Sequence, residues 1–136
     1  MGKLMLEVVT PAGIITSQEA DMVVAPGTEG EFGVLPGHIN FLSGILPGEL
    51  RINNGKKTEY MAVNYGFAEV SNDKVSVLVD TAEMAREIDI ERAQSAMERA
   101  KSRLDKDRDT EDVDFIRAES ALKRAVSRLK VAKKTK

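Results

Sequence analysis

The sequence predicts a two-part, mainly β protein, with an N-terminal sandwich or barrel followed by a C-terminal antiparallel hairpin of two helices. Up to about residue 80, short apolar runs alternate with Gly and Pro at intervals of about ten residues, as in all-β domains. Beyond Gly66 the chain has no further Gly or Pro, and Ala, Glu, Arg and Lys dominate. We therefore expect a β domain over residues 1–86 and a helical hairpin over 87–136.

The strands are expected where apolar residues run together or alternate with polar ones. Asn54-Gly55 predicts a tight hairpin between 50–52 and 60–63, because this pair favours positive φ. Val75, Val77 and Val79 alternate with other residues as in a half-buried strand, and Asn72-Asp73 supplies the turn before it. The other apolar runs are 4–10, 22–25 and 32–35.

The first helix is expected to begin after Asp89, which is a suitable N-cap residue. Residues 105–110 are polar and make a plausible connection to the second helix. Two sets of apolar or small residues follow helical spacing: Ala93, Ala96, Met97, Ala100 and Leu104, then Val113, Ile116, Ala121, Leu122, Ala125, Val126 and Leu129. Because alanines bury little area, this hairpin should be weakly held to itself and to the β domain.

The charge of the chain is divided unevenly. Residues 117–136 hold eight Lys or Arg and one Glu, a net charge of +7, so the other 116 residues carry −9 of the total of −2. Glu111, Asp112 and Asp114 open the second helix, and basic residues close it, which suits the helix dipole. A basic end on an acidic body predicts a partner with an acidic surface.

The composition offers little for catalysis. Without Cys and with His38 as the single His, the chain lacks the residues for a thiolate or multi-His metal site, and we expect no catalytic and no metal-binding residues. Gly55-Lys56-Lys57 lacks the earlier Gly and the Ser or Thr of a phosphate-binding P-loop. Gly27, Gly30 and Gly33 are better explained as turn glycines of a β domain. The N-terminus has no signal-peptide pattern, and no run is apolar enough to span a membrane.

Arginines of the two helices should meet in the hairpin. Arg92 and Arg99 share one face, as do Arg124 and Arg128, and antiparallel packing brings the first pair toward the second. Such a cluster requires either acidic partners, for which Glu91, Glu98 and Glu119 are candidates, or a bound anion such as a nucleotide phosphate. Both readings stay open on the residues alone.

Several motifs together resemble the epsilon subunit of bacterial F-type ATP synthases. They are the segment 30–38 (GEFGVLPGH), 8–11 (VVTP), the 82–89 junction (AEMAREID) and 118–125 (AESALKRA), in order along the chain. The resemblance implies a ten-stranded β-sandwich followed by an antiparallel two-helix hairpin. It also implies a non-catalytic rotor subunit of the central stalk in the proton-translocating enzyme, attached to the cytoplasmic face of the bacterial plasma membrane only through the complex.

The same resemblance implies the partners and their residues. The sandwich would bind the gamma subunit and the c-ring, with Glu31 and His38 in the contact with the c-ring. The hairpin would inhibit ATP hydrolysis by extending toward an acidic segment of the catalytic beta subunit, through Lys123, Arg124, Arg128, Lys130, Lys133 and Lys134. No cofactor is required, but ATP is implied as a possible regulatory ligand of the folded hairpin, at Glu83, Ile88, Asp89, Arg92, Ala93, Arg99, Arg124 and Arg128.

Two other functions are consistent with parts of the sequence. The arginine cluster and Asp89 would suit a protein that chiefly senses ATP. The basic end would suit a nucleic-acid binder, but the acidic body, the pI near 5.5 and the shortage of aromatic residues argue against it. We therefore expect no nucleic acid among the partners.

Overall fold

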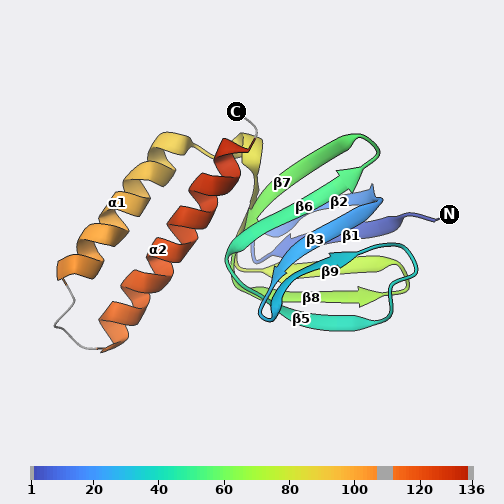
Figure 1. Ribbon diagram of the computed structural model, residues 1–136, viewed down its shortest axis with the longest axis horizontal. Coiled ribbons are helices and arrows are strands. Elements are labelled where there is room, and N and C mark those ends of the chain that lie inside the picture. The colour runs from blue at the N-terminus through green and yellow to red at the C-terminus, as the bar shows by residue number, and fades with distance from the viewer. Residues whose placement is uncertain (1, 107–111, 135–136) are drawn as a thin grey trace.

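The computed structural model describes the backbone of residues 2–106 and 112–134, and the side chains of residues 2–104 and 116–134. A β-sandwich is followed by two helices that run antiparallel beside each other and lie against one end of the sandwich (Figure 1). The predicted fold class is confirmed. Of the predicted connection over 105–110, residues 105 and 106 belong to the first helix, and the rest lies outside the described residues, as does Glu111.

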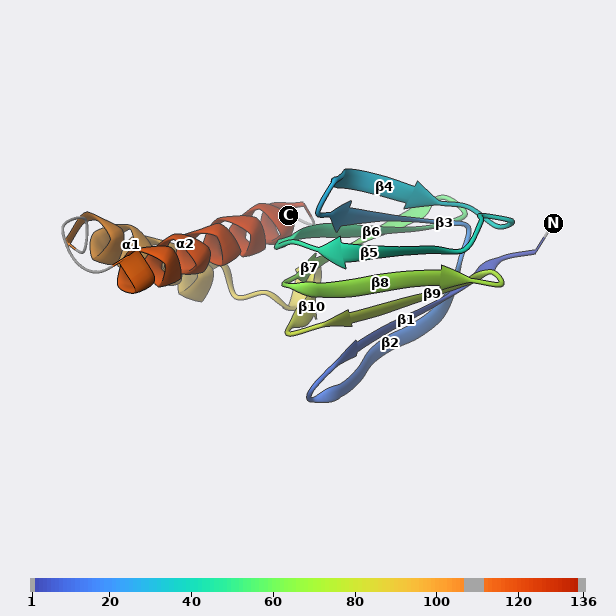
Figure 2. The same cartoon turned by 90° about the horizontal axis from the view of Figure 1, so that it is seen from below.

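Ten strands form the sandwich. They are β1 (Leu4–Thr10), β2 (Gly13–Ala20), β3 (Met22–Gly27), β4 (Gly30–Val34), β5 (Phe41–Ile45), β6 (Gly48–Asn54), β7 (Lys57–Val63), β8 (Gly66–Ser71), β9 (Lys74–Val79) and β10 (Ala82–Met84). Their order is β10-β7-β6-β3-β5-β8-β9-β1-β2, with β4 paired to β3. A single pair, Gly27 with Ile45, joins β3 to β5, so the sheet can fold over on itself there (Figure 2).

The core lies between the two halves of this folded sheet. Inward-facing residues of β1 and β9 meet those of β3, β6 and β7, and the largest of them are at most 2% exposed. These are aliphatic side chains at every second position, such as Leu4, Leu6 and Val8, as the strand period requires. The opposite faces of β1 and β9 are at least partly exposed, whereas the opposite face of β7 is covered by the helices at Ala62.

The predicted turns form where local chemistry determines them. Gly55 has φ of +66° between β6 and β7, and Asn72 and Asp73 have φ of 50° and 59° between β8 and β9, as a tight hairpin turn requires. The turn assignment of Gly33 is wrong. It lies within β4 opposite Val24, where a Cβ would meet the methyl group of Met22 at 3.2 Å.

The helical part begins with a short 3₁₀ turn, η1 (Ala85–Glu87), and continues as α1 (Ile90–Lys106) and α2 (Asp112–Lys133). Asp89 caps α1 as predicted: its Oδ1 accepts a hydrogen bond of 3.1 Å from the Arg92 amide. Ile116, one of the apolar residues that follow helical spacing in the second helix, is 61% exposed, so it is not part of the packed face of this helix.

A second, smaller cluster of buried residues, which we call the docking cluster, attaches the helices to the sandwich. It is separate from the sandwich core, and Tyr60, Ile90 and Met97 pack at its edge. Its buried members are Ala62, Ala85, Ile88, Ala93, Leu129, Val131 and Ala132. Most of the contact between the two helices and the rest of the chain comes from α2, against β6, β7 and η1, whereas α1 joins the cluster through its first turns, at Ile90 and Ala93.

Candidate functional site

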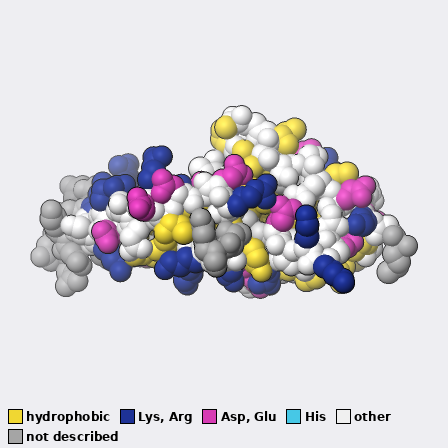
Figure 3. Space-filling model, turned by 90° about the horizontal axis from the view of Figure 1, so that it is seen from above, with side chains coloured by type: hydrophobic (Ala, Val, Ile, Leu, Met, Phe, Trp, Pro, Cys, Tyr) yellow, Lys and Arg dark blue, Asp and Glu magenta, His cyan; other side chains and the backbone are white. Residues whose placement is uncertain are grey.

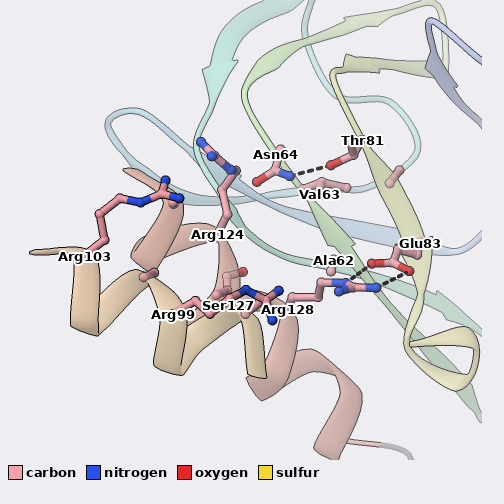
Figure 4. A pocket seen from close by; sticks show the side chains of 15 residues that line it. Ala62, Val63, Asn64, Thr81, Glu83, Arg99, Arg103, Arg124, Ser127 and Arg128 are labelled. Carbon is pink, nitrogen blue, oxygen red and sulfur yellow. Dashed lines mark hydrogen bonds and ion pairs between the residues drawn. The ribbon is translucent and has the colours of Figure 1, made fainter. Parts of the chain in front are cut away.

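The candidate site is an open cavity of about 630 Å³ between the hairpin and the edge of the sheet formed by β7 and β10. Small residues of both helices form its floor: Ala96, Ala100, Ala121 and Ala125. Asn64 donates a hydrogen bond to Thr81 across the sheet side of the cavity (Figure 4). A cavity of this size is within the range of small-ligand sites.

Four arginines surround this cavity. Arg99 and Arg103 project from α1, and Arg124 and Arg128 from α2 (Figure 4). Arg128 is half-buried and forms two hydrogen bonds with Glu83, one of them 3.2 Å from Nη2 to Oε2. The hydrogen bond with Glu83 raises the pKa of Arg128 above its ordinary value, so this guanidinium stays charged.

The other three arginines have no acidic partner among the described side chains. Guanidinium groups gathered in this way repel one another unless an anion lies between them. Of the two readings left open by the sequence, the described residues favour an anion site for Arg99 and Arg124, and an ion pair with Glu83 for Arg128.

The structure divides the predicted ATP-binding residues into two groups. Glu83, Arg99, Arg124 and Arg128 line the cavity, but Ile88, Asp89, Arg92 and Ala93 do not. Ile88 and Ala93 are buried in the docking cluster, Asp89 caps α1, and the Arg92 side chain is exposed. The motif formed by these four residues therefore fixes the start of α1 on the sandwich, which places the arginines that follow it.

Arg103 is a cavity residue that sequence reasoning missed. The signal was present, because Arg99 and Arg103 are four residues apart and must share a helical face. Asn64, Thr81 and Ser127 were missed as well. No periodic pattern marks them, since they reach the cavity only through the docking of α2 on β7.

The predicted c-ring residues lie at opposite ends of β4. Glu31 is next to the turn between β3 and β4, at the end of the sandwich that faces the helices, whereas His38 is in the connection from β4 to β5 at the far end (Figure 2). Glu31 is paired with Arg51, with 3.0 Å between Oε1 and Nη2. His38 lies against Phe41 beside the exposed side chains of Leu35 and Ile39.

The basic residues of α2 that were predicted to contact the beta subunit fall into two groups, according to whether they pair with a carboxylate of the sandwich. Lys130 and Lys133 are exposed and lack an acidic partner within the described residues, and Lys123 pairs with Glu119 of its own helix at 3.7 Å. Arg128 and Lys134 pair with Glu83 and Glu49 of the sandwich. Lys and Arg are spread over the helical half in Figure 3, with acidic side chains between them.

Comparison with known proteins identifies the family. Residues 3–85 match the β-sandwich domain of the ATP synthase delta/epsilon chain, and residues 86–133 match its long α-helix domain. The ATP synthase epsilon chain of Nitratidesulfovibrio vulgaris is 52% identical over 101 residues, which are 74% of this chain and 75% of the relative. This chain belongs to the ATP synthase epsilon-chain family.

Other relatives and solved structures agree with this assignment. The epsilon chain of Syntrophobacter fumaroxidans is 52% identical over 107 residues, 79% of this chain and 80% of its own. A chain from the OSCP/F1/c-ring structure of the Euglena gracilis mitochondrial ATP synthase superposes with a TM-score of 0.81 at 25% identity, covering 93% of this chain and 79% of that one. A chain from the central stalk and c-ring of the Tetrahymena thermophila enzyme shares the fold, with a TM-score of 0.61 at 15% identity, and covers 98% and 96%.

The predicted membership is thus confirmed, and with it the role of a non-catalytic subunit of ATP synthase. The part of the chain that the structure describes has no group of three or more His, Asp or Glu placed to hold a metal ion. Neither α1 nor α2, over its described residues, is long and apolar enough to cross a bilayer.

Proposed function

We propose that this protein is a rotor subunit of the central stalk of a proton-translocating ATP synthase, at the cytoplasmic face of a bacterial plasma membrane, and that its hairpin inhibits ATP hydrolysis. Residues 1–86 would bind the gamma subunit and the c-ring, and residues 87–136 would regulate. Membership in the epsilon-chain family and the F1/c-ring setting of the Euglena neighbour support the first part. The docking of the hairpin supports the second.

The observation that carries the regulatory role is the small apolar area that the hairpin buries against the sandwich. Four of the seven buried residues in the docking cluster are alanines. With about 0.8 kcal/mol for each buried CH₂ group, such a cluster stabilises docking only modestly. A hairpin held in this way can leave the sandwich without unfolding it.

The cations of α2 can serve two alternative states. Arg128 and Lys134 are paired with Glu83 and Glu49 in the docked hairpin. An acidic segment of the beta subunit would compete with these two sandwich carboxylates for the same cations, while Lys123, Arg124, Lys130 and Lys133 add exposed positive charge. The cations of α2 could therefore bind either of two acidic surfaces, one on the sandwich and one on the beta subunit, as a conformational switch requires.

The test is ATP hydrolysis by the assembled complex with and without residues 88–136. We expect the truncated subunit to assemble normally and hydrolysis to rise. Replacing Lys123, Lys130 and Lys133 by Gln should produce part of the same rise, and added salt should mimic it, because screening weakens the attraction. Replacing Lys56, Lys57 and Lys74 on the sandwich removes the same charge and is the control. Unchanged hydrolysis after truncation would rule out inhibition.

The outer face of β8, β9, β1 and β2 suggests where gamma binds. Phe67, Leu78, Val9 and Ile14 lie side by side in one cross-strand row, and Phe67, Leu78 and Ile14 are 63%, 52% and 64% exposed. The next row carries Glu69 and Glu7. Contiguous exposed apolar residues of this kind mark a protein interface, and the carboxylates call for basic groups on the partner.

This face can be tested by co-purification with gamma. We expect Phe67→Ser together with Leu78→Ser to abolish the gamma complex, because the apolar row would then gain little by being buried. Ile116→Ser removes a comparably exposed apolar side chain from α2 and should leave the complex intact. Equal binding of gamma by the double variant and by Ile116→Ser would place gamma on another face.

The contact with the c-ring needs two separate tests, because Glu31 and His38 lie at opposite ends of β4. We propose both residues as contacts. His38→Ala and Glu31→Gln are each expected to weaken ATP-driven proton pumping relative to hydrolysis in the complex. A variant with unchanged coupling would remove its residue from the contact.

Binding of ATP to the folded hairpin is the second candidate function, and the three arginines without acidic partners around the cavity favour it. Arg99, Arg103 and Arg124 would hold phosphate groups by charge-assisted hydrogen bonds. Isothermal titration of the chain with ATP should show saturable heat at millimolar concentrations or below. Arg99→Gln and Arg124→Gln should abolish it, whereas Arg117→Gln on the exposed side of α2 should not.

A further inference from the structure

Four charged residues of alternating sign connect the end of α2 with the turn between β3 and β4. Lys134 Nζ lies 3.3 Å from Glu49 Oε1. Glu49 Oε2 lies 3.4 Å from Arg51 Nη1, and Arg51 Nη2 lies 3.0 Å from Glu31 Oε1. Each inner residue thus contacts two partners of opposite charge through different atoms.

Of these four residues, Glu49 is the one that responds most strongly to the charges around it. Its side chain is 17% exposed, and its Oε1 is buried without a hydrogen bond from any described residue. Lys134 is therefore in contact with Oε1 but is not aligned to donate to it, and the same ammonium lies 5.4 Å from the centre of the Tyr60 ring. Glu49 Oε2 accepts a hydrogen bond from Arg51, but the buried Oε1 is balanced only by the charge of Lys134, so this carboxylate responds strongly to the charges around it.

We propose that this series is a charge relay, through which a partner that engages Glu31 controls how firmly the end of α2 is held on the sandwich. A partner that supplies a cation or an N–H group to Glu31 weakens its hold on Arg51. The positive charge of Arg51 then acts mainly on Glu49, and this weakens the attraction between Glu49 and Lys134. Occupation of the β3–β4 turn therefore loosens the hairpin.

The relay rests on the proposed function and deepens it, because it would couple the binding of a partner by the sandwich to the position of the regulatory helices. It does not depend on which subunit engages Glu31. Its electrostatic pattern can be tested in the isolated chain, without the complex and without inhibition, so the two proposals can fail separately.

The alternating signs give a distinctive expectation. Glu49→Gln and Glu31→Gln both make the surroundings of Lys134 less negative and should loosen docking. Arg51→Met makes them more negative and should tighten it. Contacts that only support the fold would loosen docking whichever residue was replaced.

The composition of the protein provides a probe. Tyr60 and Tyr65 are its only tyrosines, and Tyr60 packs at the edge of the docking cluster. In protein carrying 3-fluorotyrosine, two fluorine NMR signals are expected, and Tyr65→Phe assigns the signal of Tyr60. Saturation transfer between its docked and undocked forms then gives the ratio of undocked to docked hairpin.

We expect Glu49→Gln to raise this ratio about fivefold, Glu31→Gln to raise it about twofold, and Arg51→Met to lower it about twofold, as for partly exposed ion pairs. Glu31→Gln should have no further effect in a Glu49→Gln background. Glu29→Gln is the matched control, because Glu29 lies in the same turn with the same charge and without a partner among the described residues.

Two results would overturn the relay. Equal effects of Glu29→Gln and Glu31→Gln would mean that only the general charge of the turn matters. Looser docking in Arg51→Met, or an effect of Glu31→Gln that persists without the Glu49 charge, would mean that the four residues do not act in series.

Discussion

Arg128 of α2 and Glu83 of β10 are joined by two hydrogen bonds between the guanidinium and the carboxylate, and both side chains are 32% exposed. This pair links the last third of α2 to the final strand of the sandwich. Because Arg128 is paired with Glu83, three of the four arginines around the cavity are left without an acidic partner among the described side chains.

Glu83→Gln should weaken docking of the hairpin by about 1 kcal/mol or less, because a partly exposed pair is screened by solvent. Faster amide hydrogen exchange over residues 118–132, with unchanged exchange in β1 and β9, would show it. Glu87→Gln removes an exposed charge of η1 and should change nothing. Uniformly faster exchange throughout the sandwich would contradict this local role.

Ala93→Leu should undock the hairpin. Ala93 is 0% exposed in the docking cluster, and the added side chain costs about 1–3 kcal/mol by overpacking. The expected result is loss of protection at the end of α2, while the unfolding midpoint of the sandwich is kept. Ser95→Leu places the same side chain on the exposed face of α1 and serves as the control.

Gly66→Ala should destabilise the sandwich itself. A Cβ at this position would lie 1.9 Å from the Leu78 carbonyl oxygen, so β8 and β9 would have to separate. We expect a loss of about 3 kcal/mol in the free energy of unfolding, measured in urea. Gly33→Ala should cost far less, because its Cβ would meet the flexible end of Met22 at 3.2 Å and Val24 at an ordinary contact distance of 3.8 Å.

The stability of the sandwich should depend on Asp21 at low pH. The hydrogen bond from the Gly55 amide, with Lys3 nearby, lowers the pKa of Asp21 below its ordinary value. A carboxyl with a lowered pKa stabilises the fold above its unfolded pKa of ~3.9 and loses this contribution as the pH falls through its folded pKa. Urea unfolding of the wild type and Asp21→Asn should differ at neutral pH and converge as the pH falls through the folded pKa of Asp21. A difference in the free energy of unfolding that stayed the same at every pH would mean that the effect comes from the shape of the Asp21 side chain and not from its charge.

The parts of the fold that local chemistry determines could be predicted from the sequence. Asn54-Gly55 and Asn72-Asp73 make the turns they predict, and Asp89 caps the helix it precedes. Strand β2 was not predicted, because it lies at an edge of the sheet with most of its residues exposed and so lacks a clear alternation of apolar and polar residues.

The contacts of the candidate site could be predicted only in part. Helical spacing shows that Arg99, Arg124 and Arg128 can meet, because both helices and their antiparallel arrangement follow from the sequence. It cannot show that Glu49 receives Lys134, because that pair depends on which edge of the folded sheet α2 approaches, or that Glu31 receives Arg51, because that pair depends on β4 and β6 lying on either side of β3. Pairs so far apart in sequence leave no periodic signal.

The placement of β1 determines the order in which the protein can assemble. This strand pairs in parallel with β9, so that Met5 lies beside Lys74, and β2 can join the sheet only through β1. On the ribosome, the first strand must therefore wait until the ninth has emerged before the sandwich can close. The helices emerge after that, because they follow β10 in the chain, so α1 and α2 can meet a surface that is already folded. A nascent hairpin can thus sample docked and undocked positions from the moment it forms, because no strand of the sandwich depends on it.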